Sequence, residues 1–206
     1  LENIFEELLE YWKISLPNLK FVKEKVLNDL IEFTNQRIVY HLDELSIGKE
    51  LIKATSLSDF STKKRIINIL DLKNRINTIN LLKEKENFSE IQKVISRVSK
   101  LAENGNLKTT IFSSKNYVNP KLFEKESETK VFEFVKELEK LLSLADCNYF
   151  KLFSLFESNT KNLNELFDNE KGVLVMAENI EIRNNRLNLL CLVRNYSLKI
   201  ADFRFL

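Results

Sequence analysis

The sequence predicts an all-α fold, and three observations support this. Glycine and proline are scarce, at three and two of 206 residues, so the tight turns that join β-strands lack their usual residues. Apolar residues recur at helical spacing along most of the chain. The β-branched run from Val173 to Met176 is too short to found a sheet. We therefore expect a bundle of helices.

The first half of the chain is expected to form helices separated by polar breaks. Val22, Val26 and Leu30 lie on one stripe of a long amphipathic segment, which Pro17 and Asn18 precede as a start region. The predicted helices are residues 21–42, residues 47–54, a helix that Ser58 or Ser61 caps, and residues 88–104, opened by Asn87 or Ser89 and stopped by Gly105.

The second half begins with a polar, irregular stretch, residues 105–120, which predicts a loop. The helices expected after it are residues 127–144 with Ser127 as the cap, 149–157, 161–167 and 180–201. The last helix is apolar on nearly every side, so we expect it at the centre of the bundle. Residues 57–206 are predicted to form one helical domain, and residues 1–56 either an N-terminal helical extension or part of the same bundle.

This chain lacks the catalytic, metal-binding and phosphate-binding motifs that most enzyme classes use. Cys147 and Cys191 have no partners at metal-binding spacing and are expected to be reduced thiols. The single histidine, His41, lies in no motif, so neither a catalytic triad nor a histidine-based metal site is predicted. The three glycines form no phosphate-binding loop. We expect no catalytic residue, no metal ligand and no cofactor in this segment.

Nothing in the sequence indicates a membrane or secretory segment. No apolar run approaches the ~20 residues that cross a bilayer, and no signal-peptide pattern opens the chain. We therefore expect a cytoplasmic protein with no membrane partner. The chain begins at Leu1 rather than at a methionine, which predicts a piece of a longer protein.

The net charge of +2 conceals an uneven distribution along the chain. Residues 61–121 carry thirteen Lys and Arg against five acidic residues, a net charge of +8, whereas residues 1–60 carry −4 and residues 122–182 carry −6. Residues 183–206 end at +4. A basic segment between acidic ones is typical of a local polyanion-binding surface. Within it, the cluster of Lys63, Lys64 and Arg65 is either a solvated helix start or a phosphate contact.

The predicted helix over residues 88–104 carries the most informative candidate site. At ~100° per residue, Lys93, Arg97, Lys100 and Asn104 fall within about 60° of one another. Apolar residues occupy the opposite side. Lys and Arg neutralise phosphates, and Arg and Asn also reach base edges, so this row suits RNA. The alternative is an ordinary solvated helix face.

The loop that follows adds Lys108 and Tyr117 to the candidate RNA-binding residues. Phe112 and Tyr117 are aromatic residues among cations, a mixture that stacks unpaired bases. The alternative is that Phe112 packs into the core and Tyr117 on the bundle surface.

The last helix contributes Arg183, near its start, as a further candidate for RNA contact. Arg186 lies among leucines and is expected to form a structural ion pair, with Asp168 or Glu178 as its partner.

Several segments together resemble the β subunit of bacterial glycyl-tRNA synthetase, and they follow in the same order. These are FSEIQKVISRVSKLAEN (88–104), VNPKLFEKESETKVFEFVKEL (118–138), LFD (166–168), VLVMAEN (173–179) and RNNRLNLLCLVRNYSLKIADF (183–203). Two departures stand out. Leu166 stands where the family has the first Phe of Phe-Phe-Asp, and residues 169–172 lengthen the turn before the family's Val-Met-Val-Met.

The resemblance implies a helical anticodon-binding domain of the DALR type, like that of arginyl-tRNA synthetases, with tRNA-Gly as its ligand. It also implies a class II glycine–tRNA ligase whose ATP and Mg²⁺ chemistry belongs to an α subunit, separate or fused, in an α2β2-type assembly. The family's histidine-aspartate domain would lie upstream, in agreement with the single His41.

A different class of function remains open from the residues alone. The acidic helix within residues 122–145, or the first helix, would then dock a partner protein, and the chain would have no RNA role.

Overall fold

The computed structural model describes residues 2–45, 47–60, 68–143 and 148–206, and the prediction of an all-α fold is confirmed over these ranges. They form α-helices and two short 3-10 helices, and contain no strand. The helices are α1 (Glu2–Ser15), α2 (Lys23–Glu44), α3 (Lys49–Phe60), α4 (Ile69–Lys83), α5 (Phe88–Ala102), η1 (Pro120–Leu122), α6 (Glu126–Ser143), α7 (Tyr149–Glu165), α8 (Ile180–Ser197) and η2 (Phe203–Phe205).

The chain divides into two compact units, an N-terminal unit of Leu1–Ile76 and a C-terminal unit of Asn77–Leu206. The sequence-based division at residues 56/57 stays a prediction, and the boundary between the compact units lies twenty residues later, within α4. Because the boundary falls within α4, the first turns of this helix belong to the N-terminal unit and its remainder to the C-terminal unit. In those first turns Arg75 pairs with Asp71 at 2.6 Å and donates to the carbonyl of Thr55 at 2.9 Å.

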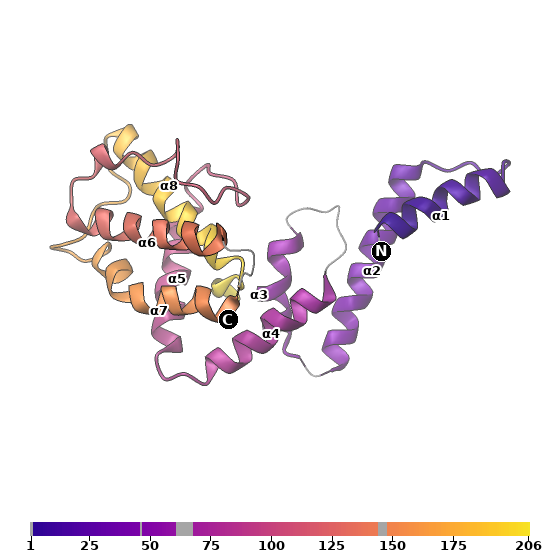
Figure 1. Ribbon diagram of the computed structural model, residues 1–206, viewed down its shortest axis with the longest axis horizontal. Coiled ribbons are helices and arrows are strands. Elements are labelled where there is room, and N and C mark those ends of the chain that lie inside the picture. Colours follow the sequence, from indigo (N-terminus) through magenta and orange to yellow (C-terminus); the bar gives the residue numbers. More distant parts are fainter. Residues whose placement is uncertain (1, 46, 61–67, 144–147) are drawn as a thin grey trace. The chain divides into compact units, whose positions relative to one another are not determined.

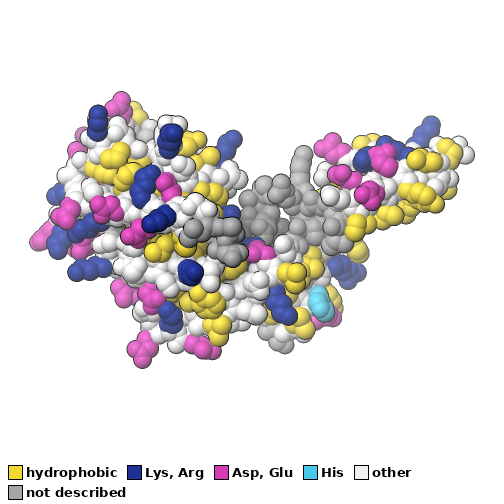
Figure 2. Space-filling view, in the orientation of Figure 1, with side chains coloured by type: hydrophobic (Ala, Val, Ile, Leu, Met, Phe, Trp, Pro, Cys, Tyr) yellow, Lys and Arg dark blue, Asp and Glu magenta, His cyan; other side chains and the backbone are white. Residues whose placement is uncertain are grey.

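The N-terminal unit consists of α1, α2, α3 and the start of α4. α1 packs on α2, and Lys23 of α2 pairs with Glu10 of α1 at 2.6 Å. Buried apolar residues include Leu9, Ile31 and Ile38. Other large apolar side chains of this unit are exposed, and Figure 2 shows hydrophobic side chains gathered over the N-terminal helices. α1 is a helix that the hydrophobic pattern did not lead us to predict.

The C-terminal unit is a bundle built around α8, as predicted. α8 packs on α5 and α6, and α7 packs on α5 and α6 (Figure 1). From Leu189 to Ser197 every residue of α8 is buried. The aromatic part of the core includes Phe134 against Phe156, with ring centroids 5.2 Å apart, and Phe153 against Phe203 at 6.3 Å. Aromatic and leucine burial on this scale makes the unit's core the main source of its stability.

Asparagine side chains cap the first turn of three α-helices in the described part of the chain. Asn148 accepts hydrogen bonds from the amides of the first turn of α7, and Asn179 does so for α8. Asn68 caps α4, which corrects the sequence expectation of a serine: Ser58 lies inside α3, and Ser61 falls outside the described residues. An asparagine oxygen satisfies amides that have no partner within the helix.

Two further boundaries differ from the prediction for local reasons. Ser127, expected as a cap, lies inside α6 and donates to the carbonyl of Lys171, while Glu128 accepts from the amides of Glu124 and Lys125. α7 is one helix where two were expected. Its polar residues Ser158, Asn159 and Thr160 bond back to carbonyls one turn earlier, so the helix continues through them.

Candidate nucleic-acid interface

The basic row predicted on α5 is present as a helix face. Lys93, Arg97 and Lys100 are exposed, whereas Ile91, Val94, Ile95 and Val98 on the opposite side are buried. Asn104, just after the helix, is exposed and donates to the carbonyl of Leu101 at 3.1 Å. We call Lys93, Arg97 and Lys100 the α5 ridge. Seven residues separate its ends, or about 10 Å at 1.5 Å per residue.

The cations of the α5 ridge differ from other basic residues of this unit in their pairing. Among the residues that the structure describes, none of its three cations forms an ion pair with a carboxylate. Glu103, the acidic residue at the end of the helix, pairs instead with Arg204. Elsewhere in this unit Lys85, Lys130 and Lys136 each pair with a glutamate. An unpaired row of cations attracts a polyanion.

Arg97 has an aromatic partner that the sequence did not reveal. Its guanidinium lies over the ring of Phe167, 4.4 Å from the ring centre. Phe167 follows α7 and belongs to the Leu-Phe-Asp segment, so this contact joins α5 to the end of α7. A cation over an aromatic face is held in place while its N–H groups at the edge stay available to acceptors. Arg97 is therefore a positioned donor.

The loop between α5 and α6 takes its shape from polar side chains of α8. Arg194 is buried and donates to the carbonyls of Ala102 at 3.1 Å and Leu107 at 2.9 Å. Asn195 donates to those of Lys108 at 2.8 Å and Ile111 at 2.7 Å. Buried backbone carbonyls need such donors, and here one helix supplies them. The loop is therefore held firmly although it has little secondary structure of its own.

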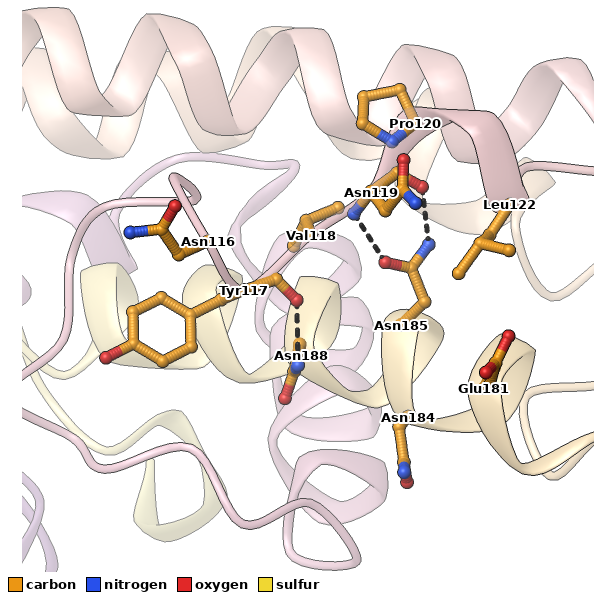
Figure 3. Close-up of a pocket in the computed structure, with 10 residues that line it drawn as sticks. All are labelled: Asn116, Tyr117, Val118, Asn119, Pro120, Leu122, Glu181, Asn184, Asn185 and Asn188. Atoms are coloured by element: carbon orange, nitrogen blue, oxygen red, sulfur yellow. Dashed lines mark hydrogen bonds between the residues drawn. The ribbon is translucent and has the colours of Figure 1, made fainter.

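A second pair of α8 side chains holds the far end of the same loop. Asn185 accepts from the amide of Asn119 at 2.7 Å and donates to its carbonyl at 3.1 Å, and Asn188 donates to the carbonyl of Tyr117 at 2.8 Å (Figure 3). The Tyr117 side chain takes no part in this contact and is 40% exposed. The loop thus presents the ring while its backbone is fixed.

The predicted RNA-binding residues outside α5 lie at separate places in the structure. Lys108 is exposed on the loop segment that Asn195 holds, after the end of α5. The backbone of Tyr117 is held by Asn188. Asn188 precedes Asn195 by seven residues on α8, which corresponds to about 10 Å along the helix. Arg183 is half-buried in the first turns of α8. The cluster of Lys63, Lys64 and Arg65 falls outside the described residues.

Phe112 is not available as a stacking surface in the way that Tyr117 is. Its ring packs edge-on against Tyr196, with centroids 5.4 Å apart, and the ammonium of Lys199 lies 4.6 Å from its centre. The Tyr196 hydroxyl donates to the backbone carbonyl of Phe112. Burial raises the pKa of Tyr196, so the hydroxyl stays a donor. Phe112 thus belongs to the support of the loop.

Arg186 is buried in an ion-pair network whose members correct our expectation. Its guanidinium donates to Glu128 at 2.9 Å, to Glu124 at 2.6 Å and to the carbonyl of Leu174 at 3.1 Å. Burial alone would lower the pKa of Arg186, but the bonds to Glu128 and Glu124 outweigh it and hold that pKa above its ordinary value. Neither expected partner, Asp168 or Glu178, is among them. Asp168 instead accepts from the backbone amides of Lys171 and Glu170, which lower its pKa.

The described residues were compared with the requirements of a metal site. They bring together no group of three or more His, Cys, Asp or Glu side chains that could hold a metal ion. Cys191 is buried, and burial raises the pKa of its thiol, while Cys147 falls outside the described ranges. Within the described part of the chain, every helix is too short or too polar to cross a membrane.

Comparison with known proteins gives one consistent result. No family model matches the chain. The glycine–tRNA ligase β subunit of Gloeothece citriformis is 31% identical over 186 residues, which cover 88% of this chain and 26% of that subunit. The β subunit of Picosynechococcus sp. is 32% identical over 185 residues, with the same coverage. That of Clostridioides difficile is 26% identical over 197 residues, or 95% of this chain. The chain spans about a quarter of the length of these relatives.

Proposed function

The chain belongs to the glycine–tRNA ligase β-subunit family, and from this premise we propose that it binds the anticodon arm of tRNA-Gly. In this proposal the catalytic chemistry, with ATP and Mg²⁺, belongs to the α subunit or a fused α region of an α2β2-type cytoplasmic ligase. The chain itself selects and holds the tRNA, in the manner of a DALR-type anticodon-binding domain.

The observation that carries the proposal is the α5 ridge. Three exposed cations lie in one row without carboxylate partners among the described residues, and the held loop carries a further exposed cation, Lys108. Such a row contacts phosphates and orients an RNA strand, while the nearby Asn104 and Arg97 side chains can reach base edges. A fold that fixes the backbone of its loop before binding loses little entropy when RNA is bound.

The test is binding of tRNA-Gly by the 206-residue chain and by charge-reversal variants. We expect Lys93→Glu/Lys100→Glu to weaken binding at least about tenfold, because two phosphate contacts become repulsive. The matched control is Lys140→Glu/Lys151→Glu, which makes the same charge change at exposed lysines of α6 and α7. Equal affinity of both variants would remove the α5 ridge from the interface.

The anticodon part of the proposal needs its own measurement. A tRNA-Gly with substituted anticodon bases should bind more weakly than the natural tRNA, whereas substitutions in the acceptor stem should have no effect on binding to this chain. The reverse pattern would leave RNA binding in place but contradict recognition of the anticodon arm.

A second function, docking onto protein, is favoured by α1. Ile4, Leu8, Tyr11 and Trp12 recur at helical spacing and are between 47% and 64% exposed, while Leu9 is buried. A stripe of this size on one helix is typical of a protein interface. We propose that it contacts another part of the ligase, because the relatives are named as subunits and extend well beyond this chain.

This second proposal predicts a separation of two activities. Tyr11→Ser/Trp12→Ser should weaken association of a β subunit with the rest of the ligase, measured by sedimentation, and leave tRNA-Gly binding by the 206-residue chain unchanged. Unchanged assembly in the folded variant would show that the stripe is not an interface.

A further inference from the structure

Arg97 occupies the middle of the α5 ridge and differs from its two neighbours in chemistry. Lys93 precedes it by four residues and Lys100 follows it by three, about 6 Å and 4.5 Å along the helix axis. An ammonium is a compact point charge, whereas a guanidinium is planar and presents paired N–H groups that match two oxygens of a phosphate. Among the described residues, neither lysine contacts an aromatic ring. Arg97 does, so the structure distinguishes it from the cations on either side.

The aromatic contact covers one side of Arg97 and leaves its hydrogen-bond donors open. The guanidinium carbon lies 4.4 Å from the centre of the Phe167 ring. The Arg97 side chain is exposed, and its N–H groups donate to no other residue in the described part of the chain. A side chain already held against a ring loses less rotamer freedom when it binds a ligand. The guanidinium is thus oriented before a ligand binds.

Phe167 is carried by a closed turn, residues 166–173, that follows α7. Leu166 is buried, and its carbonyl accepts from the amide of Val173 at 3.0 Å. The Asp168 carboxylate accepts from two backbone amides inside the turn, at 2.8 Å and 3.0 Å. These bonds fix the chain on both sides of Phe167. The ring therefore takes its place from the backbone of the turn.

The same turn has no room for a side chain at Gly172. A Cβ there would lie 2.6 Å from the carbonyl oxygen of Leu166 and 2.7 Å from the amide nitrogen of Asp168. Both are backbone atoms, so no side-chain rotation would relieve the contact. The two residues that flank Phe167 are thus packed directly against the end of the turn. A turn built this tightly holds the ring at a defined position beside α5.

From these contacts we infer that Arg97 binds one phosphate group of the RNA backbone through paired N–H groups, and that Phe167 is the residue that positions it. Lys93 and Lys100 place positive charge on both sides, which favours an anionic group at the centre over the uncharged edge of a base. The lysines then supply non-directional attraction, and Arg97 sets the register of the strand. This inference rests on the proposed RNA-binding function and assigns a directional contact to it.

The phosphate contact is tested by a substitution that keeps the charge. Arg97→Lys should weaken binding of tRNA-Gly by the 206-residue chain about fivefold to tenfold, because the paired donors are lost. Lys93→Arg, the matched control, should stay within about twofold of the wild type. Wild-type affinity of Arg97→Lys would overturn the inference. Arg97→Ala should also reduce the slope of log affinity against log salt by about 0.7–0.9, and an unchanged slope would contradict a phosphate as the partner.

The positioning role is tested at Phe167. Phe167→Leu removes the ring and keeps much of the apolar volume, so it should weaken tRNA-Gly binding about threefold to tenfold, whereas Phe167→Tyr should retain the wild-type affinity because the ring remains. Phe33→Leu is the matched control, since it removes the ring under Arg37 on α2, where the guanidinium lies 5.3 Å from the ring centre. A similar loss in Phe33→Leu, or equal losses in the two Phe167 variants, would overturn the positioning role.

Two further readouts separate positioning from a general structural effect. In Phe167→Leu the Nε–H resonance of Arg97 should lose the ring-current shift that it has in the wild type, and an unchanged resonance would contradict the contact. Arg97→Lys/Phe167→Leu should bind about as weakly as Arg97→Lys alone, because the ring acts through the guanidinium. Losses that simply add would show that Phe167 acts independently of Arg97.

The outcomes distinguish this inference from the proposed function. Weaker binding in Lys93→Glu/Lys100→Glu, together with wild-type binding in Arg97→Lys, would overturn the Arg97 contact and leave the RNA-binding function standing. Absence of tRNA-Gly binding by the wild-type chain would overturn both. Because Arg97 is exposed, its variants decide the question even if Phe167→Leu fails to fold.

Discussion

Two buried arginines of α8 stabilise the fold through different partners. Arg186 binds carboxylates of the segment before α6 and of α6 itself, whereas Arg194 binds carbonyls of the loop after α5. The leucines around Arg186 in the sequence favoured a structural role for it. They could not identify Glu124 and Glu128 as partners, because these residues approach only when α6 packs on α8.

Removing one member of the buried pair should cost far more than replacing the whole pair. Glu128 is fully buried, so Glu128→Ala leaves the Arg186 charge without its closest partner and should lower the free energy of unfolding by about 3–5 kcal/mol. Glu128→Leu/Arg186→Met should cost less than the single substitution. Urea unfolding of both variants measures this, and a larger loss in the double variant would contradict the assignment.

Acid should destabilise the protein partly through Glu157. The Lys85 ammonium, 2.7 Å away, and the Asn87 amide hold the pKa of Glu157 below its ordinary 4.5. The stabilisation is therefore present above pH 4.5 and lost as the pH falls through the lower folded-state pKa. The free energy of unfolding of Glu157→Gln, followed from pH 6 to pH 3, should fall less steeply than that of the wild type. Parallel curves would show that this pair contributes nothing.

At the scale of elements, the spacing of apolar residues in the sequence predicted most helices. It did not predict which helices contact one another. Apolar spacing predicted α2, α5, α6 and α8, and the buried character of α8. It divided α7 in two, because Ser, Asn and Thr in sequence indicate a break although their side chains bond within the helix. It missed α1, whose apolar residues are mostly exposed and lack the pattern of a buried face.

The junction of α5 and α8 depends on a glycine. A Cβ at Gly105 would lie 2.6 Å from Sγ of Cys191, so a side chain at this position requires the Cys191 side chain or the loop to shift. Gly105→Ala should lower the free energy of unfolding by about 1–3 kcal/mol. Gly105→Ala/Cys191→Ala should recover much of the loss, and Gly48→Ala, where nothing lies within 4 Å of the new Cβ, should not show it. Failure of the second substitution to rescue would contradict this contact as the cause.

At the scale of the whole molecule, the sequence predicted the fold class and the family but only part of the candidate interface. The row of Lys93, Arg97 and Lys100 follows from helical spacing. The support of the loop by Asn185, Asn188, Arg194 and Asn195 does not, because these contacts join residues more than sixty positions apart. The same distance in sequence concealed the contact of Phe167 with Arg97. The position of exposed cations on a helix can thus be predicted from their spacing in the sequence. The residues that hold those cations and the loop in place can be identified only from the folded structure.

The most direct test of the α5 ridge is the salt dependence of tRNA-Gly binding. Each lost phosphate contact should reduce the slope of log affinity against log salt by about 0.7–0.9, so Lys93→Ala/Lys100→Ala should bind with a slope shallower by about 1–2 than the wild type. Lys140→Ala/Lys151→Ala should keep the wild-type slope. Three equal slopes would contradict the claim that the α5 ridge contacts the RNA.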